Sequence, residues 1–501
     1  MQGFRNILVF LAAGSIAGCT VGPNYHGPQS NVPAQWTEPL LGGETNSSPS
    51  IATWWKSFND AELDSLIDRA VHSNLDLRIA QGRVREARGQ SGIVDADFWP
   101  SVDASGSYAR ARESANQPLL GQLSLPPSVS LENDVYQAGF DASWEVDVFG
   151  GTRRAAEAAN ANIAAAIYSG QDVQVILVSE VARNYAAARS FQGRLAIARE
   201  NIKAQQDTVA MARDRYKNGL TNELDPEQAA TVLAQTEAQV PTLEDGLQAS
   251  IHRLGVLLGQ QPGALLTEMA TDAPIPATPP QVPVGLPSDL LRRRPDIRNA
   301  ERQLAAATAQ IGVAMADLFP KFSLTGDIGL QSVSTSDLFT AGSRFWSVGP
   351  TVQWRIFDAG RIRSNIRVQN ARQEQALATY EQTVLTSFED VENALVAYAK
   401  EQTRNVSLQD AVKTSQRSLQ ISRRLYANGL TTFINVLDAE RSLYQAQDDL
   451  VQSDQAVTQN LIALYKAMGG GWEESTPASA SPSTLAASAT GEDVHYVNDP
   501  K

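Results

Sequence analysis

Apolar residues recur at every seventh position along much of the C-terminal half of the chain. Residues 361–428 contain no glycine and no proline, so they predict a single helix roughly 100 Å long. The heptad positions of this segment are apolar in six of seven cases: Val384, Val391, Tyr398, Asn405, Val412, Leu419 and Tyr426. Asn428-Gly429 then favours a left-handed helix stop, and a second heptad runs through Val436, Leu443, Leu450, Val457 and Leu464. The pattern predicts a long antiparallel helical hairpin.

The same arrangement occurs earlier in the chain, which indicates an internal tandem duplication. Residues 76–100 align without gaps on residues 296–320 with nine identities in 25 positions, and Tyr216–Thr221 matches Tyr426–Thr431. Each unit predicts a helix, a strand pair, a very long helix, a sharp turn and a return helix. In the first unit we expect one helix over 61–95, and Pro241 should kink the return helix.

Four stretches beside the long helices alternate between apolar and polar residues. They cover residues 102–108, 136–148, 322–330 and 346–356, and each predicts a strand with one apolar face. Strands of about ten residues with this pattern fit a membrane β-barrel, although a soluble sheet with one buried face has the same pattern. No stretch after residue 19 approaches the roughly 18 consecutive apolar residues of a membrane helix, which favours the barrel.

The N-terminus reads as a lipoprotein signal. Residues 1–18 carry an early arginine, an apolar core and small residues before Cys19, the one cysteine in 501 residues. Ile16–Cys19 resembles a bacterial lipobox, so we expect a covalent lipid on Cys19 and no other cofactor. Thr20 follows the cysteine where an aspartate commonly signals inner-membrane retention, which favours the outer membrane.

Four strands cannot close a barrel, because about eight are the minimum and an open edge cannot lie in lipid. We therefore expect three copies to share one outer-membrane β-barrel of twelve strands, with the long helices arranged into an α-helical barrel. The predicted class is an α+β membrane protein, divided as follows: signal peptide 1–18, extended segment 19–60, first repeat 61–261, Pro-rich linker 262–288, second repeat 289–472 and disordered tail 473–501.

Catalytic chemistry is not indicated by the sequence. The four histidines are scattered without metal-ligand spacing, and neither a phosphate-binding glycine loop nor a nucleophile elbow occurs. A net charge of −14 argues against a nucleic-acid partner. We therefore predict no catalytic, cofactor-binding or metal residues, and a protein that is not an enzyme.

Four segments resemble the signature of the TolC-like outer membrane efflux proteins, in the OprM-like lipoprotein branch. They are Leu290–Glu301, Ile311–Pro320, Ile356–Arg361 and Cys19–Tyr25, and the resemblance extends from Cys19 to about Trp472. It implies a homotrimer with a twelve-stranded barrel and a periplasmic helical tunnel. The tunnel would dock on a periplasmic adaptor and an inner-membrane pump that export drugs. Two alternatives stay open: a pore-free periplasmic adaptor lipoprotein and a type I protein-secretion duct.

The resemblance also places a gate at the periplasmic helix turns. Asp225 and Asp438 match acids found there, and Tyr426 matches a gate tyrosine. Thr431 stands where members can carry a basic lock residue, and Asn435 stands where a further acid can occur. We therefore expect the closed state to rest more on coil packing than on salt bridges. The alternative for both acids is a charge favoured by a helix N-terminus.

The two turns themselves are the expected adaptor contacts. Their residues are Gly219, Leu220, Thr221, Gly429 and Leu430. A role as simple helix stops would account for the same residues.

Overall fold

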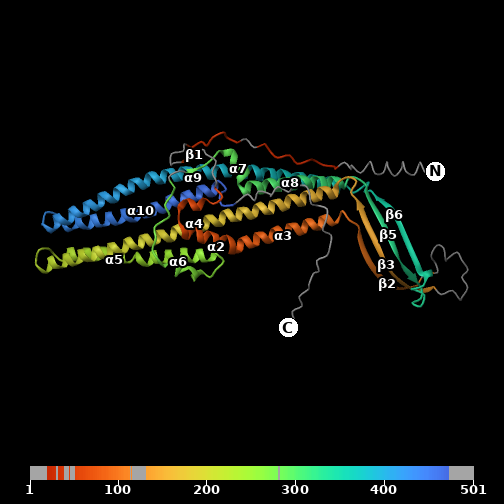
Figure 1. Ribbon diagram of the computed structural model, residues 1–501, viewed down its shortest axis with the longest axis horizontal. Helices are drawn as coiled ribbons and strands as arrows, with labels where there is room; N and C mark the ends of the chain where they lie inside the picture. The colour runs from red at the N-terminus through yellow and green to blue at the C-terminus, as the bar shows by residue number, and fades with distance from the viewer. Residues whose placement is uncertain are drawn as a thin grey trace.

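The computed structural model describes residues 20–29, 32–38, 44–45, 51–112, 114, 131–279 and 282–472. Within these ranges the chain forms an elongated helical body with a four-stranded sheet at one end (Figure 1). The predicted signal peptide, Cys19, the predicted tail 473–501 and most of the first strand-joining loop lie outside the described residues.

The elements follow the predicted order twice. The first repeat comprises η1 (Trp54–Phe58), α2 (Ala61–Ser73), α3 (Leu75–Ala96), β2 (Ser101–Arg112), β3 (Glu132–Val146), α4 (Gly151–Lys217), α5 (Leu224–Glu237) and α6 (Val240–Leu257). The second comprises α7 (Pro287–Arg293), α8 (Pro295–Ala316), β5 (Lys321–Ser332), η5 (Ala341–Ser343), β6 (Arg344–Gln353), α9 (Arg361–Ala427) and α10 (Phe433–Ala467). Between them lie η3 (Pro262–Leu265), η4 (Glu268–Ala270) and β4 (Val282–Pro283), and β4 pairs in parallel with β1 (Glu44–Thr45).

The duplication is confirmed in the lengths of the elements. Helices α3 and α8 have 22 residues each, strands β2 and β5 have 12 each, and α4 and α9 have 67 each. Even a side-chain contact is repeated. Trp144 Nε1 donates to Phe98 O at 2.9 Å, and Trp354 Nε1 donates to Leu318 O at 3.0 Å.

Several predicted boundaries were wrong or incomplete. The single helix expected over 61–95 is two helices, because Asn74 has an extended backbone and its side chain accepts from the first amides of α3. Strand β3 begins four residues before the predicted stretch, where Arg110 and Arg112 of β2 pair with Glu132, and ends two residues earlier. Strand β6 ends at Gln353 instead of 356. The break predicted near Pro241 is confirmed, since α5 ends at Glu237 and Pro241 lies in the first turn of α6.

The four long strands form an antiparallel sheet in the order β2-β3-β5-β6. On one face the register aligns Ala104, Phe140, Ile328 and Trp346 across the sheet. The last three are exposed, as are Val102, Val348 and Val352 on the same face. This sheet therefore presents an unpacked apolar surface in the isolated chain.

The opposite face of the sheet carries a row of acids. The register places Asp103 beside Asp141, Asp141 beside Asp327, and Asp327 beside Ser347. Ser347 donates its hydroxyl hydrogen bond to Asp327. Like charges directly opposite one another on neighbouring strands are unfavourable, so this row is not explained by strand pairing.

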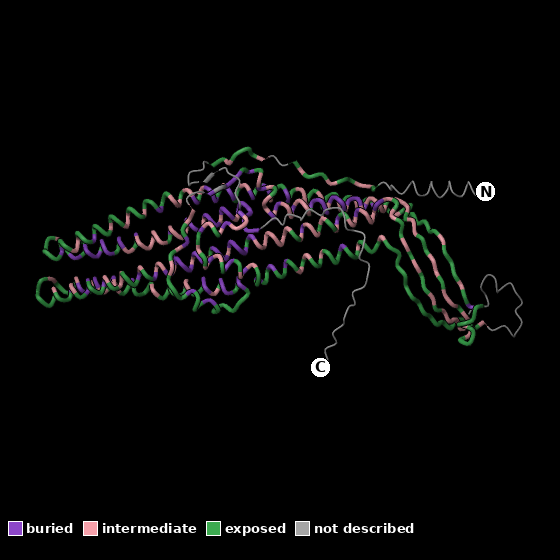
Figure 2. The backbone as a smooth tube through the Cα atoms, in the orientation of Figure 1, coloured by how far each residue is buried: buried purple, intermediate pink, exposed green. Residues whose placement is uncertain are grey.

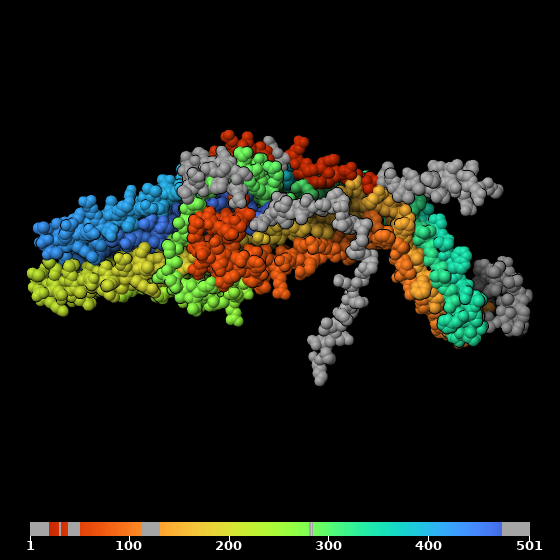
Figure 3. Space-filling view, viewed as in Figure 1, coloured from red at the N-terminus to blue at the C-terminus, as the bar shows by residue number. Residues whose placement is uncertain are grey.

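The core follows the predicted heptad seams (Figure 2). The buried positions of these seams include Val391, Tyr398, Val436 and Leu464. Helix α10 packs along α9 over most of the length of α10. Figure 3 shows that the middle of the helical body is its broadest part, where α2, α6 and the N-terminal segments cover the long helices. Among the described helices, none combines the length and apolar character needed to cross a bilayer.

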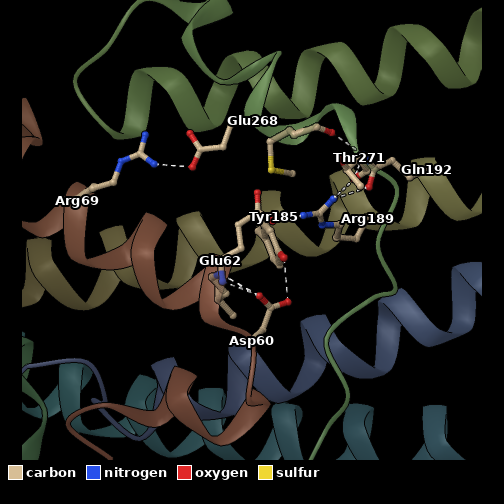
Figure 4. Close-up of polar contacts among 10 residues, drawn as sticks. Asp60, Glu62, Arg69, Tyr185, Arg189, Gln192, Glu268 and Thr271 are labelled. Atoms are coloured by element: carbon tan, nitrogen blue, oxygen red, sulfur yellow. Dashed lines mark hydrogen bonds and ion pairs between the residues drawn. The ribbon is translucent and has the colours of Figure 1, made fainter.

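A buried arginine fixes α4 in this broad middle region (Figure 4). Arg189 donates to the carboxylate of Glu62 at the start of α2 and to Thr271 O at 2.8 Å. Tyr185, one turn earlier on α4, donates to Asp60 Oδ2 at 2.8 Å. These contacts hold α2 and the segment after η4 against one level of α4.

Candidate functional site

The predicted turn residues form two equivalent tips at the end of the molecule remote from the sheet (Figure 1). Gly219 and Gly429 have φ values of +68° and +69°, the left-handed conformation that glycine adopts without strain. Leu220 N donates to Arg215 O and Leu430 N donates to Leu425 O, both at 2.9 Å, which closes each helix end. Both leucine side chains point into solvent, with 65% and 73% of their surfaces exposed.

The structure brings Tyr426 and Asp225 together across the two tips. Tyr426 Oη, near the end of α9, donates to Asp225 Oδ2 in the first turn of α5 at 3.1 Å. Thr221 donates its hydroxyl hydrogen bond to the same oxygen. Burial, together with the hydrogen bond and charge of Asp225, raises the pKa of Tyr426 above its usual value. The phenol is therefore the donor, and it links one helical hairpin to the other.

Arg215 supplies a cation to this contact. Its guanidinium carbon lies 4.7 Å from the centre of the Tyr426 ring, and Phe433 packs on the ring from α10 at 5.0 Å between centroids. A cation over a partly buried ring is attracted to its negative face. Arg215 thus brings a positive charge from α4 to the Tyr426 ring.

The remaining predicted gate residues lie apart from Tyr426. Asp438 is exposed and pairs only loosely with Arg441, at 3.7 Å, on its own helix. Asn435 Nδ2 donates to Thr431 Oγ1 at 2.7 Å, also within one tip. Within the described residues, the hydrogen bond and the ion pair of these three residues stay inside the second hairpin.

Sequence reasoning missed a second contact between the hairpins. Glu440 of α10 is 4% exposed, and its Oε1 accepts from Arg423 Nη2 at 2.8 Å and from Thr208 Oγ1 at 2.7 Å. The ion pair between Arg423 and Glu440 joins α9 and α10 within the second hairpin, and the hydrogen bond from Thr208 links it to α4. A signal existed, because Glu440 lies on the apolar stripe between Val436 and Leu443.

The described part of the chain holds no group of three or more histidine, cysteine or acidic side chains placed to bind a metal ion. Hydrogen bonds and ring contacts at the tips hold the two hairpins together, and the exposed leucines face the solvent.

Comparison with known proteins gives a consistent result. The chain matches the model of the outer membrane efflux protein family over residues 66–260 and 286–470, once per repeat. It is 34% identical to the probable outer membrane lipoprotein SilC of Salmonella typhimurium, over 92% of this chain and 97% of that protein. It is 32% identical to the toluene efflux pump outer membrane protein TtgI of Pseudomonas putida, over 94% and 99%. The solved outer-membrane channel OprN superposes with a TM-score of 0.83 at 36% identity, over 91% of this chain and all of that chain.

Proposed function

Since this chain belongs to the outer membrane efflux protein family, we propose that it is the passive exit duct through which an efflux system releases small molecules. It is a homotrimeric channel of the outer membrane that extends into the periplasm and works with periplasmic adaptor proteins and inner-membrane pumps. The alternative of a pore-free adaptor is set aside, because the matches along both repeats are to channel proteins.

The open four-stranded sheet is the observation that carries this proposal. Among the described residues, β2 and β6 each pair with one strand only, so the sheet has two free edges and an exposed apolar face. Free backbone groups cannot lie in lipid, and three copies joined edge to edge leave none. The apolar face would then meet lipid and the face with the aspartates would line the pore.

We further propose that the chain does no chemistry on its cargo. The relatives are channel proteins, and the energy for transport would come from the pump. Relatives named for toluene export support small-molecule cargo.

Conductance of the purified trimer tests the proposal directly. Detergent-extracted protein should be a trimer by native mass spectrometry and should form ion-conducting pores in planar bilayers. A soluble monomer without conductance would contradict it. Deletion of the gene should also lower the export of small dyes from cells, and the wild-type gene should restore it.

A lipid anchor on Cys19 fits the position of the residue that follows it. Thr20 lies against Gly150, and Val21 N donates to Phe149 O at 3.1 Å, where β3 leads into α4. In the proposed barrel the strands would leave the membrane near this junction, so acyl chains on Cys19 would enter the inner leaflet there. Mass spectrometry of the mature protein should find lipid on Cys19, and Cys19→Ser should remove it. A mature chain that begins at another residue would contradict the anchor.

The gate is proposed at the Tyr426–Asp225 contact, with Asp438, Asn435 and Thr431 as further gate residues elsewhere on the second tip. Tyr426→Phe keeps the ring for Arg215 but removes a hydrogen bond of about 1 kcal/mol. The resting conductance should rise, and Asp225→Asn should raise it less because the amide oxygen still accepts. Equal conductance in both variants and the wild type would place the gate elsewhere.

The tips are proposed as the adaptor contact, through Gly219, Leu220, Thr221, Gly429 and Leu430. The exposed leucines at the tips of both hairpins favour an apolar partner surface. Leu220→Glu with Leu430→Glu should abolish cross-linking to the adaptor in cells, whereas Leu266→Glu in the broad middle region should not. Cross-linking that survives the double change would contradict the contact.

A further inference from the structure

The start of α9, next to the sheet, carries an unbalanced positive charge. Residues 361–373 contain four arginines and no acid, although the whole chain has a net charge of −14. Arg363 and Arg367 lie four residues apart and therefore share one face of the helix. Both are exposed, and neither forms an ion pair with an acid in the described part of the chain. Arg367 Nη2 donates to Ser364 Oγ at 3.0 Å, on its own helix.

The equivalent helix of the first repeat, α4, has its charges paired at this level. Arg153 binds Asp147 at 3.1 Å. Glu157 stands where α9 has Arg367, and it pairs with Arg154 at 2.7 Å. The positive charge is thus balanced within the first repeat but not at the start of α9.

The N-terminal segment shows which face of the upper helices is the outer one. It runs along α8 (Figure 1), where Gly22 lies against Gly312 and Tyr25 Oη donates to Glu301 Oε1 at 3.2 Å. These two positions of α8 are 11 residues, or about three turns, apart and so share one face. Since acyl chains on Cys19 would enter lipid outside the barrel, the face of α8 that contacts this segment is the outer face.

The equivalent face of α3 carries two further exposed arginines, Arg85 and Arg88. Gly92 corresponds to Gly312 in the alignment of the repeats, and the arginines lie seven and four residues before it on the same face. This face of α3 is open, since a Cβ at Gly92 would meet no atom within 4 Å. Arg85 is 11 residues from the end of α3 at Ala96, so both arginines lie within roughly 17 Å of that end.

Closure of the barrel brings the two pairs of arginines together. Strand β2 follows α3 and β6 precedes α9, and among the described residues each of these strands pairs with one strand only. Three sheets joined edge to edge place β2 beside β6 of the next copy, and therefore α3 beside α9. Each boundary between two copies then carries Arg85 and Arg88 from one copy and Arg363 and Arg367 from the next.

Exposed apolar side chains lie on the sheet side of these arginines. Trp354, Ile356 and Phe357 connect β6 to α9 and are 56%, 83% and 87% exposed, and Trp99, before β2, is 75% exposed. Aromatic side chains at such places lie at the boundary between the hydrocarbon and the headgroups of a bilayer. A cationic cluster beside an exposed apolar one matches a ligand with an anionic head and an apolar body.

We propose that each boundary between two copies binds an anionic phospholipid of the inner leaflet, with its phosphate on the four arginines and its acyl chains beside Trp354 and Phe357. The site rests on the proposed barrel, since one copy supplies only half of it. Arginine binds phosphate through two parallel N–H groups. On α9 the Cα–Cβ bonds tilt toward the helix N-terminus, so Arg363 and Arg367 lean toward the sheet and the headgroups.

Native mass spectrometry of the detergent-extracted trimer with added phosphatidylglycerol tests the site. The wild type should retain one molecule per boundary and bind phosphatidylglycerol at least about tenfold more tightly than phosphatidylcholine. A basic residue near an anionic lipid contributes about fivefold in affinity. Arg363→Gln with Arg367→Gln should therefore weaken binding by about 25-fold, and Arg85→Gln with Arg88→Gln should do the same.

Two further variants control for charge and for folding. Arg417→Gln with Arg424→Gln removes the same charge from exposed positions near the other end of α9 and should leave binding unchanged. Arg363→Lys with Arg367→Lys keeps the charge and should retain most of the binding. A loss as large as in the glutamine variant would show that the arginines act on folding and not on lipid.

The outcomes separate the lipid site from the channel. If the wild-type trimer conducts but does not prefer phosphatidylglycerol, the site is refuted and the channel stands. If binding depends on the α9 pair alone, the site lies within one copy and the assignment to the boundary is wrong. If excess inorganic phosphate displaces the lipid, the site takes a free anion. If no trimer forms, the proposed function fails and the site fails with it.

Discussion

Only glycine fits at position 22. Its φ is +91°, and a Cβ there would lie 2.5 Å from the Cα of Gly312 on α8. Arg154 holds the same segment, because its Nε donates to Val21 O at 3.1 Å and its Nη2 to Asn24 Oδ1 at 2.7 Å.

We therefore predict that Gly22→Ala releases the N-terminal segment from α8. Hydrogen–deuterium exchange of residues 20–29 should increase clearly in the variant. Gly27→Ala is the control, since a Cβ at that position meets no atom within 4 Å. Unchanged protection in Gly22→Ala would show that the close approach is not required.

The burial of Asp454 predicts that the stability of the folded chain depends on pH. Partial burial raises the pKa of its carboxyl, opposed by the hydrogen bond that Asn405 Nδ2 donates at 2.7 Å. A raised carboxyl pKa means that the folded state prefers the protonated form. The resulting stabilisation is complete below the ordinary pKa of an aspartate and is lost as the pH rises through the raised value.

Asp454→Asn should therefore raise the dissociation temperature of the trimer at neutral pH, and the difference should shrink as the pH falls toward about 4. Light scattering during heating measures it. The exposed Asp410→Asn should change nothing at neutral pH. A variant that is less stable than the wild type at neutral pH would contradict the sign.

At the residue scale, the limits of prediction follow from geometry. Tyr426 and Asp225 were identified by resemblance, because each stands at a fixed distance from an Asn-Gly turn. Arg215 was not, since its position over the Tyr426 ring depends on how two turns far apart in the sequence pack. Glu440 interrupts an apolar stripe and could have been noticed, but its partner on α4 could not.

At the scale of elements, the run without glycine or proline predicted the long helix of the second repeat to within one residue. The helix predicted over 361–428 is α9, at Arg361–Ala427, because Gly360 and Gly429 mark its ends and neither glycine nor proline lies inside. The division at Asn74 was missed, since asparagine is tolerated inside helices as well as at their starts. Asn74 packs against α6, where its Nδ2 donates to Leu257 O at 2.8 Å. This contact holds the side chain in the position from which it caps α3.

We predict that Asn74→Ala destabilises the broad middle region by about 1–2 kcal/mol, through loss of the cap and of the bond to Leu257. Asn74→Asp separates the two terms, because a carboxylate still accepts from the amides of Asp76 and Leu77 but cannot donate. Its effect on the dissociation temperature should be intermediate only if the cap matters. Identical losses in both variants would assign the whole effect to the Leu257 contact.

At the scale of the whole molecule, the row of Asp103, Asp141 and Asp327 becomes a ring of nine carboxylates when three sheets close. Rings of acids inside a pore attract cations and repel anions. The pore should therefore prefer cations whatever the state of the gate. Any selectivity test of Asp225 or Asp438 must take this ring into account.

Changing all three aspartates to asparagine should shift the reversal potential toward zero under a salt gradient, with little loss of conductance. Asp68→Asn on the exposed surface of α2 is the control and should leave it unchanged. A reversal potential that is the same in the triple variant and the wild type would show that the ring is fully neutralised by bound counter-ions.

The two free edges of the sheet have a genetic consequence. Because every pore takes its strands from three copies, a variant chain that pairs normally but fails to open enters pores together with wild-type chains. With equal expression and random mixing, only about one pore in eight would consist of wild-type chains alone. A closed-gate allele of this protein should therefore be dominant, whereas an allele that removes strand β2 or β6 should be recessive.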